Sequence, residues 1–135
     1  MIGLDTGFFV ALLRDEPVPR KIWKQVIEGD LDASCSCLTF FELERLGLRG
    51  AVDKKATTLL LRAIPALCKV IWLDVPEPLV ESARLSHTHG IPSLDALILG
   101  GLLHVGAKKV YTTDSDLGKL KRRGVKVINL RSATR

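Results

Sequence analysis

The sequence contains only three cysteines, and none of them is spaced as C-x-x-C. An odd count without that spacing argues against a disulfide framework and against a zinc site. We therefore expect Cys35, Cys37 and Cys68 to be small buried side chains. Low-complexity tracts are missing as well, and 47% of the residues are hydrophobic. This composition excludes a mainly disordered protein.

Long apolar runs and a basic leader are also absent. No run reaches the roughly 18 uncharged residues that a membrane span needs. The first residues, MIGLDTGFF, contain no Lys or Arg and include an acid at position 5, which is not the pattern of a signal peptide. We therefore expect a cytoplasmic protein without a membrane segment. The length of 135 residues suits one domain that spans residues 1–135.

The net charge of +5 is unevenly distributed along the chain. Residues 108–135 hold nine Lys and Arg against two Asp, whereas residues 1–107 hold eleven against thirteen acids. A concentrated positive segment suggests an anionic partner, with nucleic acid as the first candidate. The alternative is a solvated helix end. The basic residues of interest are Lys119, Lys121, Arg122 and Arg123.

Short apolar segments alternate with segments of helical periodicity throughout the chain. The patterns predict strands at 1–5, 31–36, 69–73, 108–112 and 125–130, and helices at 6–14, 20–28, about 40–50, 53–67, 79–89, 94–107 and 115–123. Residues 15–19 contain two prolines and are predicted as a loop, and Pro65 is expected to bend or end its helix. This alternation predicts an α/β fold with a parallel, layered sheet.

The predicted helix at 94–107 is apolar except for Asp95 near its start and the neutral His104. Helices that are apolar all round are buried, and a buried unpaired carboxylate is costly. One interpretation is that Ser93 caps the helix and Asp95 lies in the first turn, where the helix dipole favours an anion. The other is that Asp95 points into a cleft and holds a metal ion together with other carboxylates. The helix alone leaves both open.

Further acids stand at the edges of apolar segments. Asp5 follows the first predicted strand, Glu42 lies in the helix after the second, and Asp114 ends a late strand with Asp116 two residues on. Active sites of parallel sheets gather outside the carboxyl ends of the strands, so we expect these acids to converge. Neighbouring carboxylates repel one another unless a cation intervenes. Oxygen ligands without histidine suit Mg²⁺ or Mn²⁺ better than zinc.

Each acid also has a purely structural interpretation. Asp5 could cap the helix that follows it, and Glu42 could pair with Arg45 or Arg49 on its own helix. The two late acids could cap the basic helix. Glu44 lies about 200° around the helix from Glu42 and cannot serve the same cleft. Taken singly these interpretations are competitive, but they do not explain why acids recur at the edges of apolar segments.

The ordered set of motifs resembles the PIN-domain family and, within it, the VapC-like toxin ribonucleases. The matching segments are IGLDT at 2–6, TFFEL at 39–43, DALI at 95–98 and TTDSD at 112–116. The resemblance implies a three-layer fold with helices on both faces of the sheet. It also implies that Asp5, Glu42, Asp95 and Asp114 form a catalytic metal site, with Asp116 as an accessory ligand and Thr6 and Thr112 orienting carboxylates.

The same resemblance implies an activity and partners. The expected activity is Mg²⁺- or Mn²⁺-dependent hydrolysis of RNA, with Lys119, Lys121, Arg122 and Arg123 along the RNA backbone. Toxin members of the family dimerise and are silenced by an antitoxin that blocks the cleft. The apolar segments 22–27 and 59–67 are the two candidates for the dimer face. The sequence departs from the family pattern at two positions. Gly7 stands where the family often has Asn or another polar residue, and Leu117 stands where an aromatic residue often follows the last acid.

Other interpretations explain less of the chain. The tripeptide at 5–7 spells the D-T-G of aspartic proteases, but helical spacing follows at once where that fold is β. An aspartyl phosphatase would have an acid at Gly7, and a dinucleotide-binding unit would have a glycine-rich loop there. His87 and His89 are two apart and do not share a helix face. The alternative that stays open is a non-catalytic PIN-like module that binds RNA or protein.

Overall fold

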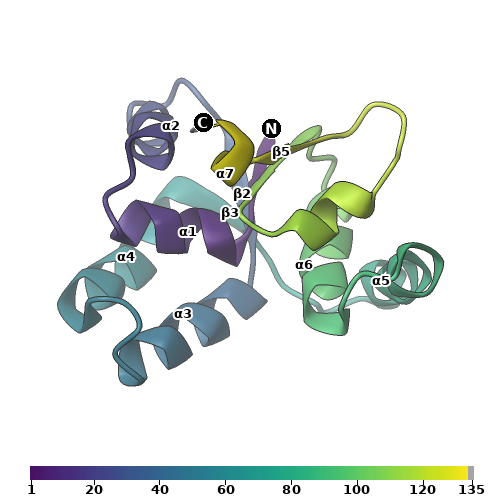
Figure 1. Cartoon of the computed structure of the whole chain (residues 1–135), viewed down its shortest axis with the longest axis horizontal. Coiled ribbons are helices and arrows are strands. Elements are labelled where there is room, and N and C mark those ends of the chain that lie inside the picture. The colour runs from purple at the N-terminus through teal and green to yellow at the C-terminus, as the bar shows by residue number, and fades with distance from the viewer. Residues whose placement is uncertain (134–135) are drawn as a thin grey trace.

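Five parallel strands form the centre of the computed structural model, which describes residues 1–133 (Figure 1). They are β1 (Ile2–Leu4), β2 (Ala33–Ser36), β3 (Cys68–Ile71), β4 (Lys109–Thr112) and β5 (Lys126–Asn129). Their order across the sheet is β3-β2-β1-β4-β5, and every neighbouring pair is parallel. The predicted α/β class and parallel sheet are confirmed.

Helices cover both faces of this sheet, so the molecule has three layers (Figure 1). One face carries α1 (Thr6–Leu13), α2 (Pro17–Ile27), α3 (Leu38–Leu48) and α4 (Lys54–Leu67), and the other carries α5 (Pro76–His89) and α6 (Ser93–His104). The remaining elements are the 3₁₀ helix η1 (Ser115–Lys119) and the short α7 (Leu130–Ala133). No helix in the described part of the chain is long and apolar enough to cross a membrane.

Alternation along β1 divides its side chains between the two cores. Ile2 and Leu4 belong to the core under α1 to α4, as the period of two in a strand requires. Gly3 faces the other side, where a Cβ would lie 3.1 Å from a methyl carbon of Leu102 in α6. The missing side chain therefore lets the apolar α6 pack closely against the centre of the sheet.

Two predicted helix starts were wrong, and a proline lies at each. α2 begins at Pro17 within the predicted loop, and α5 begins at Pro76, earlier than expected. Proline suits the first turn of a helix because the N–H that it lacks would have no partner there. Pro65 does not end α4, which continues to Leu67. The basic helix predicted at 115–123 is shorter than expected, and the structure has only the 3₁₀ helix η1, Ser115–Lys119, in this segment.

The start and the middle of α6 position the helix against its neighbours. Ser93 is its first residue rather than its cap, and no side chain caps this end, so the predicted capping role of Ser93 is wrong. A Cβ on Gly100 would lie 2.0 Å from the hydroxyl oxygen of Ser82 in α5, whereas one on Gly101 would lie 3.4 Å from Ile71 of β3. α6 therefore packs against α5 and the sheet at once.

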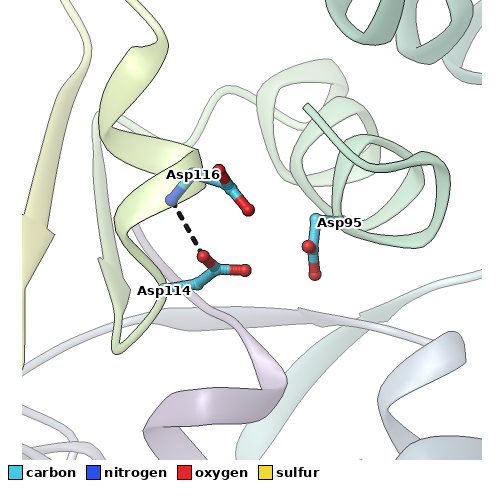
Figure 2. A group of neighbouring side chains, drawn as sticks. All are labelled: Asp95, Asp114 and Asp116. Atoms are coloured by element: carbon cyan, nitrogen blue, oxygen red, sulfur yellow. Dashed lines mark hydrogen bonds between the residues drawn. The ribbon is translucent and has the colours of Figure 1, made fainter. Parts of the chain in front are cut away.

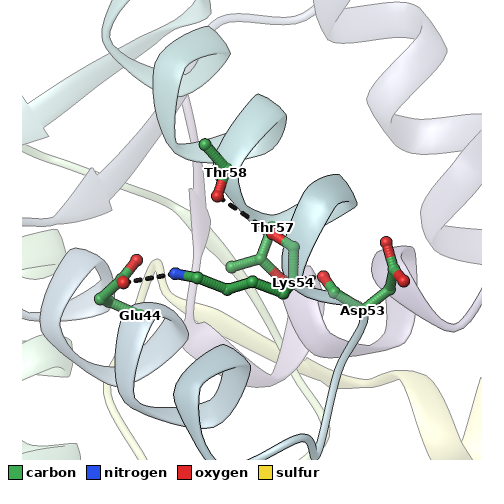
Figure 3. Close-up of polar contacts among 5 residues, drawn as sticks. All are labelled: Glu44, Asp53, Lys54, Thr57 and Thr58. Atoms are coloured by element: carbon green, nitrogen blue, oxygen red, sulfur yellow. Dashed lines mark hydrogen bonds and ion pairs between the residues drawn. The ribbon is translucent and has the colours of Figure 1, made fainter.

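Polar contacts at the start of α4 fasten it to α3 (Figure 3). The carboxylate of Asp53 accepts a hydrogen bond from the backbone N–H of Ala56 at 2.9 Å, which caps α4. Lys54 Nζ lies 2.5 Å from Glu44 Oε1 of α3. Glu44 thus points toward α4 and away from the site of Glu42, as the helix geometry predicted.

The apolar helix faces considered for dimerisation are largely internal. Trp23 and Val26 of α2 and Leu60 and Ile64 of α4 are buried in the core of this chain. These residues are therefore not available to a second copy, whereas Ile27 and Leu59 in the same two segments are 55% and 66% exposed. The cysteines are free thiols: Cys35 and Cys68 are buried and Cys37 is half-buried.

Candidate metal centre

Asp5 lies at the carboxyl end of β1 and is 5% exposed. Its Oδ1 accepts a hydrogen bond from the backbone N–H of Phe8 at 2.9 Å, so the side chain caps α1. Its Oδ2 accepts a hydrogen bond from the hydroxyl of Thr112 at the end of β4. Asp5 therefore has both predicted positions: it caps α1, and it lines the acidic pocket described below.

Thr112 and the segment that follows it order the late acids. The Thr112 hydroxyl oxygen accepts a hydrogen bond from the backbone N–H of Asp114 at 2.8 Å. Asp114 Oδ1 in turn accepts one from the backbone N–H of Asp116 at 2.8 Å. Asp114 caps η1 by this contact, as the structural interpretation of the sequence proposed.

Glu42 is positioned by threonines and not by arginines. The hydroxyl of Thr6 donates a hydrogen bond to Glu42 Oε1 at 2.5 Å and lies 3.1 Å from the hydroxyl of Thr39. Within residues 1–133, no ion pair joins Glu42 to Arg45 or Arg49. The structure therefore does not support the interpretation of Glu42 as an ion-pair partner on its own helix.

Three further carboxylates face a common space (Figure 2). Oxygen atoms of Asp95, Asp114 and Asp116 all lie within 4.8 Å of one another. Asp95 comes from the first turn of α6, and the other two come from the segment after β4. Asp116 also forms an ion pair with Lys119 at 2.7 Å. The fold thus gathers acids from elements far apart in the chain.

Four of the predicted acids line one pocket of about 210 Å³. Asp116 is not among its lining residues. Sequence reasoning assigned no role to the neutral wall residues Val10, Ile98 and Thr113. The lining residues are Asp5, Thr6, Gly7, Val10, Glu42, Asp95, Ile98, Thr113, Asp114 and Leu117.

The electrostatics of this pocket are those of crowded carboxylates. The pKa of Asp95 is raised to about 7, first by burial, then by its hydrogen bond with Asp114, and then by the charges of nearby acids. Burial raises the pKa of Asp5 to about 6, although the hydrogen bonds from Thr112 and Phe8 act in the opposite direction. The charges of Asp114 and Glu42 raise both values further. All four carboxylates therefore interact.

The family model of the PIN domain matches residues 2–123. The chain belongs to the PIN-domain family. The predicted family is confirmed. No curated protein matches this sequence.

Solved structures of toxins and toxin-antitoxin complexes have a similar fold. The chain resembles a toxin-antitoxin complex from Klebsiella pneumoniae at 18% identity, covering 95% of this chain and 96% of that one, with a TM-score of 0.67. It resembles VapBC2 from Rickettsia felis, bound to a DNA fragment of its promoter, at 15% identity, 96% and 98% coverage and a TM-score of 0.71. VapC20 from Mycobacterium tuberculosis, a sarcin-ricin loop cleaving toxin, matches at 16%, with 93% and 99% coverage and a TM-score of 0.66.

The donor set of this PIN domain fits a hard divalent cation. The acids that meet at the pocket offer carboxylate oxygens, and the one metal-type cluster within residues 1–133 consists of aspartates alone. Mg²⁺ and Mn²⁺ prefer such ligands, whereas zinc sites use histidine and cysteine. Burial, and then the charges of the neighbouring acids, raise the pKa values of Asp5 and Asp95. A bound cation would remove that penalty.

The two departures from the family pattern have structural explanations. A Cβ on Gly7 would lie 2.1 Å from the hydroxyl oxygen of Thr113, so the Thr113 side chain occupies the space of a side chain at position 7. Thr113 thereby brings a hydroxyl to the pocket wall. Leu117 is 1% exposed and packs in the core beneath α6. In the sequence, the one signal for Thr113 is that it directly precedes Asp114.

The basic segment is partly neutralised by the protein's own acids. Lys119 pairs with Asp116, and Arg122 forms an ion pair with Glu81 of α5. Lys121 and Arg123 are exposed. The segment is therefore a weaker positive surface than its charge count suggested.

Proposed function

We propose that this protein is an Mg²⁺- or Mn²⁺-dependent endoribonuclease and the toxin of a VapC-like toxin-antitoxin pair. The observation that carries the proposal is the pocket in which Asp5, Glu42, Asp95 and Asp114 meet, where burial and then the neighbouring charges raise the pKa of Asp5 and Asp95. Crowded carboxylates bind a divalent cation, and the bound cation in turn binds an anionic phosphodiester.

Each residue has a distinct role in this proposal. Asp5, Glu42, Asp95 and Asp114 hold the cation, and Asp116 contributes from the rim once it releases Lys119. Thr112 and Thr6 fix the orientations of the Asp5 and Glu42 carboxylates by hydrogen bonds. When bound, Mg²⁺ or Mn²⁺ supplies a Lewis acid that binds phosphate oxygens and makes water more acidic. The residues of the basic segment, Lys121 and Arg123 foremost, contact the RNA backbone.

The partners follow from the same proposal. Similar structures include a toxin-antitoxin complex, and this supports an antitoxin protein whose segment would cover the acidic pocket. We also propose a homodimer, with both copies acting in the cytoplasm, where RNA is available. An adjacent small open reading frame and the size of the purified protein in solution test these two points.

The deciding experiment is incubation of the purified protein with mixed cellular RNA in Mg²⁺ or Mn²⁺. We expect cleavage that EDTA stops and that Glu42→Gln and Asp95→Asn abolish. Glu44→Gln is the matched control, because Glu44 lies on the same helix but pairs with Lys54. Binding of RNA without cleavage in either metal would refute the enzyme and favour the alternative, a non-catalytic PIN module.

A further inference from the structure

A second pocket adjoins the acidic one along α3. It has a volume of about 140 Å³ and is lined by Phe41, Glu42, Arg45, Leu46, Arg49 and Leu94. Glu42 lines both pockets, and Leu94 directly precedes Asp95. A ligand that lies in this second pocket can therefore continue into the acidic pocket.

The outer wall of the second pocket is a regular stripe on α3. Phe41, Arg45 and Arg49 are spaced by four residues, so they lie on one side of the helix on successive turns, about 6 Å apart along its axis. All three are exposed, and 62% of Phe41 is accessible to solvent. The α3 stripe therefore places an exposed aromatic ring beside two guanidinium groups at the rim of the second pocket.

The positive charges of this α3 stripe are not used within the described chain. The acids nearest in sequence are engaged elsewhere: Glu42 binds Thr6, and Glu44 pairs with Lys54 (Figure 3). Over residues 1–133, no ion pair involves Arg45 or Arg49. The α3 stripe thus offers two unpaired arginines beside the acidic pocket.

We propose that the α3 stripe, Phe41–Arg45–Arg49, binds the single-stranded RNA segment next to the phosphodiester that enters the acidic pocket. Guanidinium groups bind phosphates in a bidentate manner, and an exposed aromatic ring stacks on any base. Regularly spaced cations beside an aromatic match a polymer of alternating phosphates and planar bases. The location of the scissile bond rests on the proposed nuclease function, but binding by the α3 stripe does not.

Binding is tested in EDTA, where cleavage is absent, with a fluorescein-labelled single-stranded RNA of mixed sequence. We expect Arg45→Ala and Arg49→Ala each to weaken binding and to lower the slope of log K against log salt by about 0.7, the loss of one phosphate contact on a single strand. Phe41→Ala should weaken binding roughly tenfold with the slope unchanged, because it removes stacking and no charge. Arg45→Lys should restore the slope.

The matched control is Arg62→Ala, an exposed arginine of α4 that does not line the pocket. It should change neither the affinity nor the slope. Melting temperatures equal to that of the parent protein would confirm that each variant is folded, as expected for exposed positions.

Three outcomes overturn the inference. The first is failure of the parent protein to bind the RNA at low salt. The second is an unchanged affinity and slope in the Arg45→Ala, Arg49→Ala double variant, or an equal loss in Arg62→Ala. The third is a double variant that keeps the RNA affinity of the parent protein but no longer binds a poly-glutamate peptide. That result would assign the α3 stripe to an acidic protein partner. RNA binding that responds as expected without cleavage in Mg²⁺ or Mn²⁺ refutes the nuclease alone.

Discussion

The hydroxyl of Thr112 donates a hydrogen bond to Oδ2 of Asp5, although 107 positions separate them in the chain. The contact joins the ends of β4 and β1, which are neighbours in the sheet. Because the same hydroxyl oxygen accepts a hydrogen bond from the backbone N–H of Asp114, one side chain sets the relative positions of two acids. Thr112 is therefore the residue through which the sheet organises the candidate metal centre.

Thr112→Val should disturb both acids without changing the shape of the core. We expect the free energy of unfolding to fall by about 1–3 kcal/mol, because a buried carboxylate oxygen and a backbone N–H lose their partner. The pKa of Asp5 should rise above about 6, because this hydrogen bond lowers it. Urea denaturation and a carboxyl NMR titration measure the two effects. Thr58→Val, which removes an exposed hydroxyl, should change stability by no more than about 0.5 kcal/mol.

Without metal, stability should fall as the pH rises. The pKa values of Asp5 and Asp95 in the folded protein are about 6 and about 7, both above the ordinary 3.8. The folded state therefore holds protons that the unfolded chain has released, and the stability that these protons give is lost between about pH 4 and pH 7. Urea denaturation in EDTA across this range checks the sign. Asp95→Asn should flatten the curve, and a parent curve that rises with pH would contradict the crowding of these acids.

Divalent metal should reverse that loss at neutral pH. A cation that binds only the folded state stabilises it by mass action, by about 2.7 kcal/mol at one hundred times its dissociation constant. We expect Mg²⁺ or Mn²⁺ to raise the melting temperature of the parent protein and to leave that of Asp114→Asn nearly unchanged. A parent protein that shows no shift at millimolar metal would count against a preformed site.

The two adjacent glycines of α6 should respond differently to alanine. A Cβ on Gly100 would collide with Ser82 at 2.0 Å and approach the carbonyl oxygen of Pro78 at 3.2 Å. We therefore expect Gly100→Ala to destabilise by about 1–3 kcal/mol, as overpacking does. Gly101→Ala meets Ile71 at 3.4 Å and gains helix propensity, so its stability should at least equal that of the parent. Equal losses in the two variants would show that α6 does not pack as described.

Local patterns predicted a large part of this structure. Apolar runs and helical spacing located all five strands and most helices, because these periodicities reflect burial on one or both faces. The errors lie where one residue type has two uses. Pro17 and Pro76 begin helices although prolines also mark loops, and the end of the basic helix depended on packing that no local pattern contains.

The sequence by itself determined the order of strands and helices, the positions of Asp5, Glu42, Asp95 and Asp114 at the edges of apolar segments, and the family. Only the tertiary structure decided how these acids meet. Strand order, the reach of Thr112 to Asp5, and the pairing of Lys119 and Arg122 with the protein's own acids all join distant parts of the chain. Such contacts depend on which strands become neighbours, and strand pairing is set by packing of the whole sheet rather than by local preference.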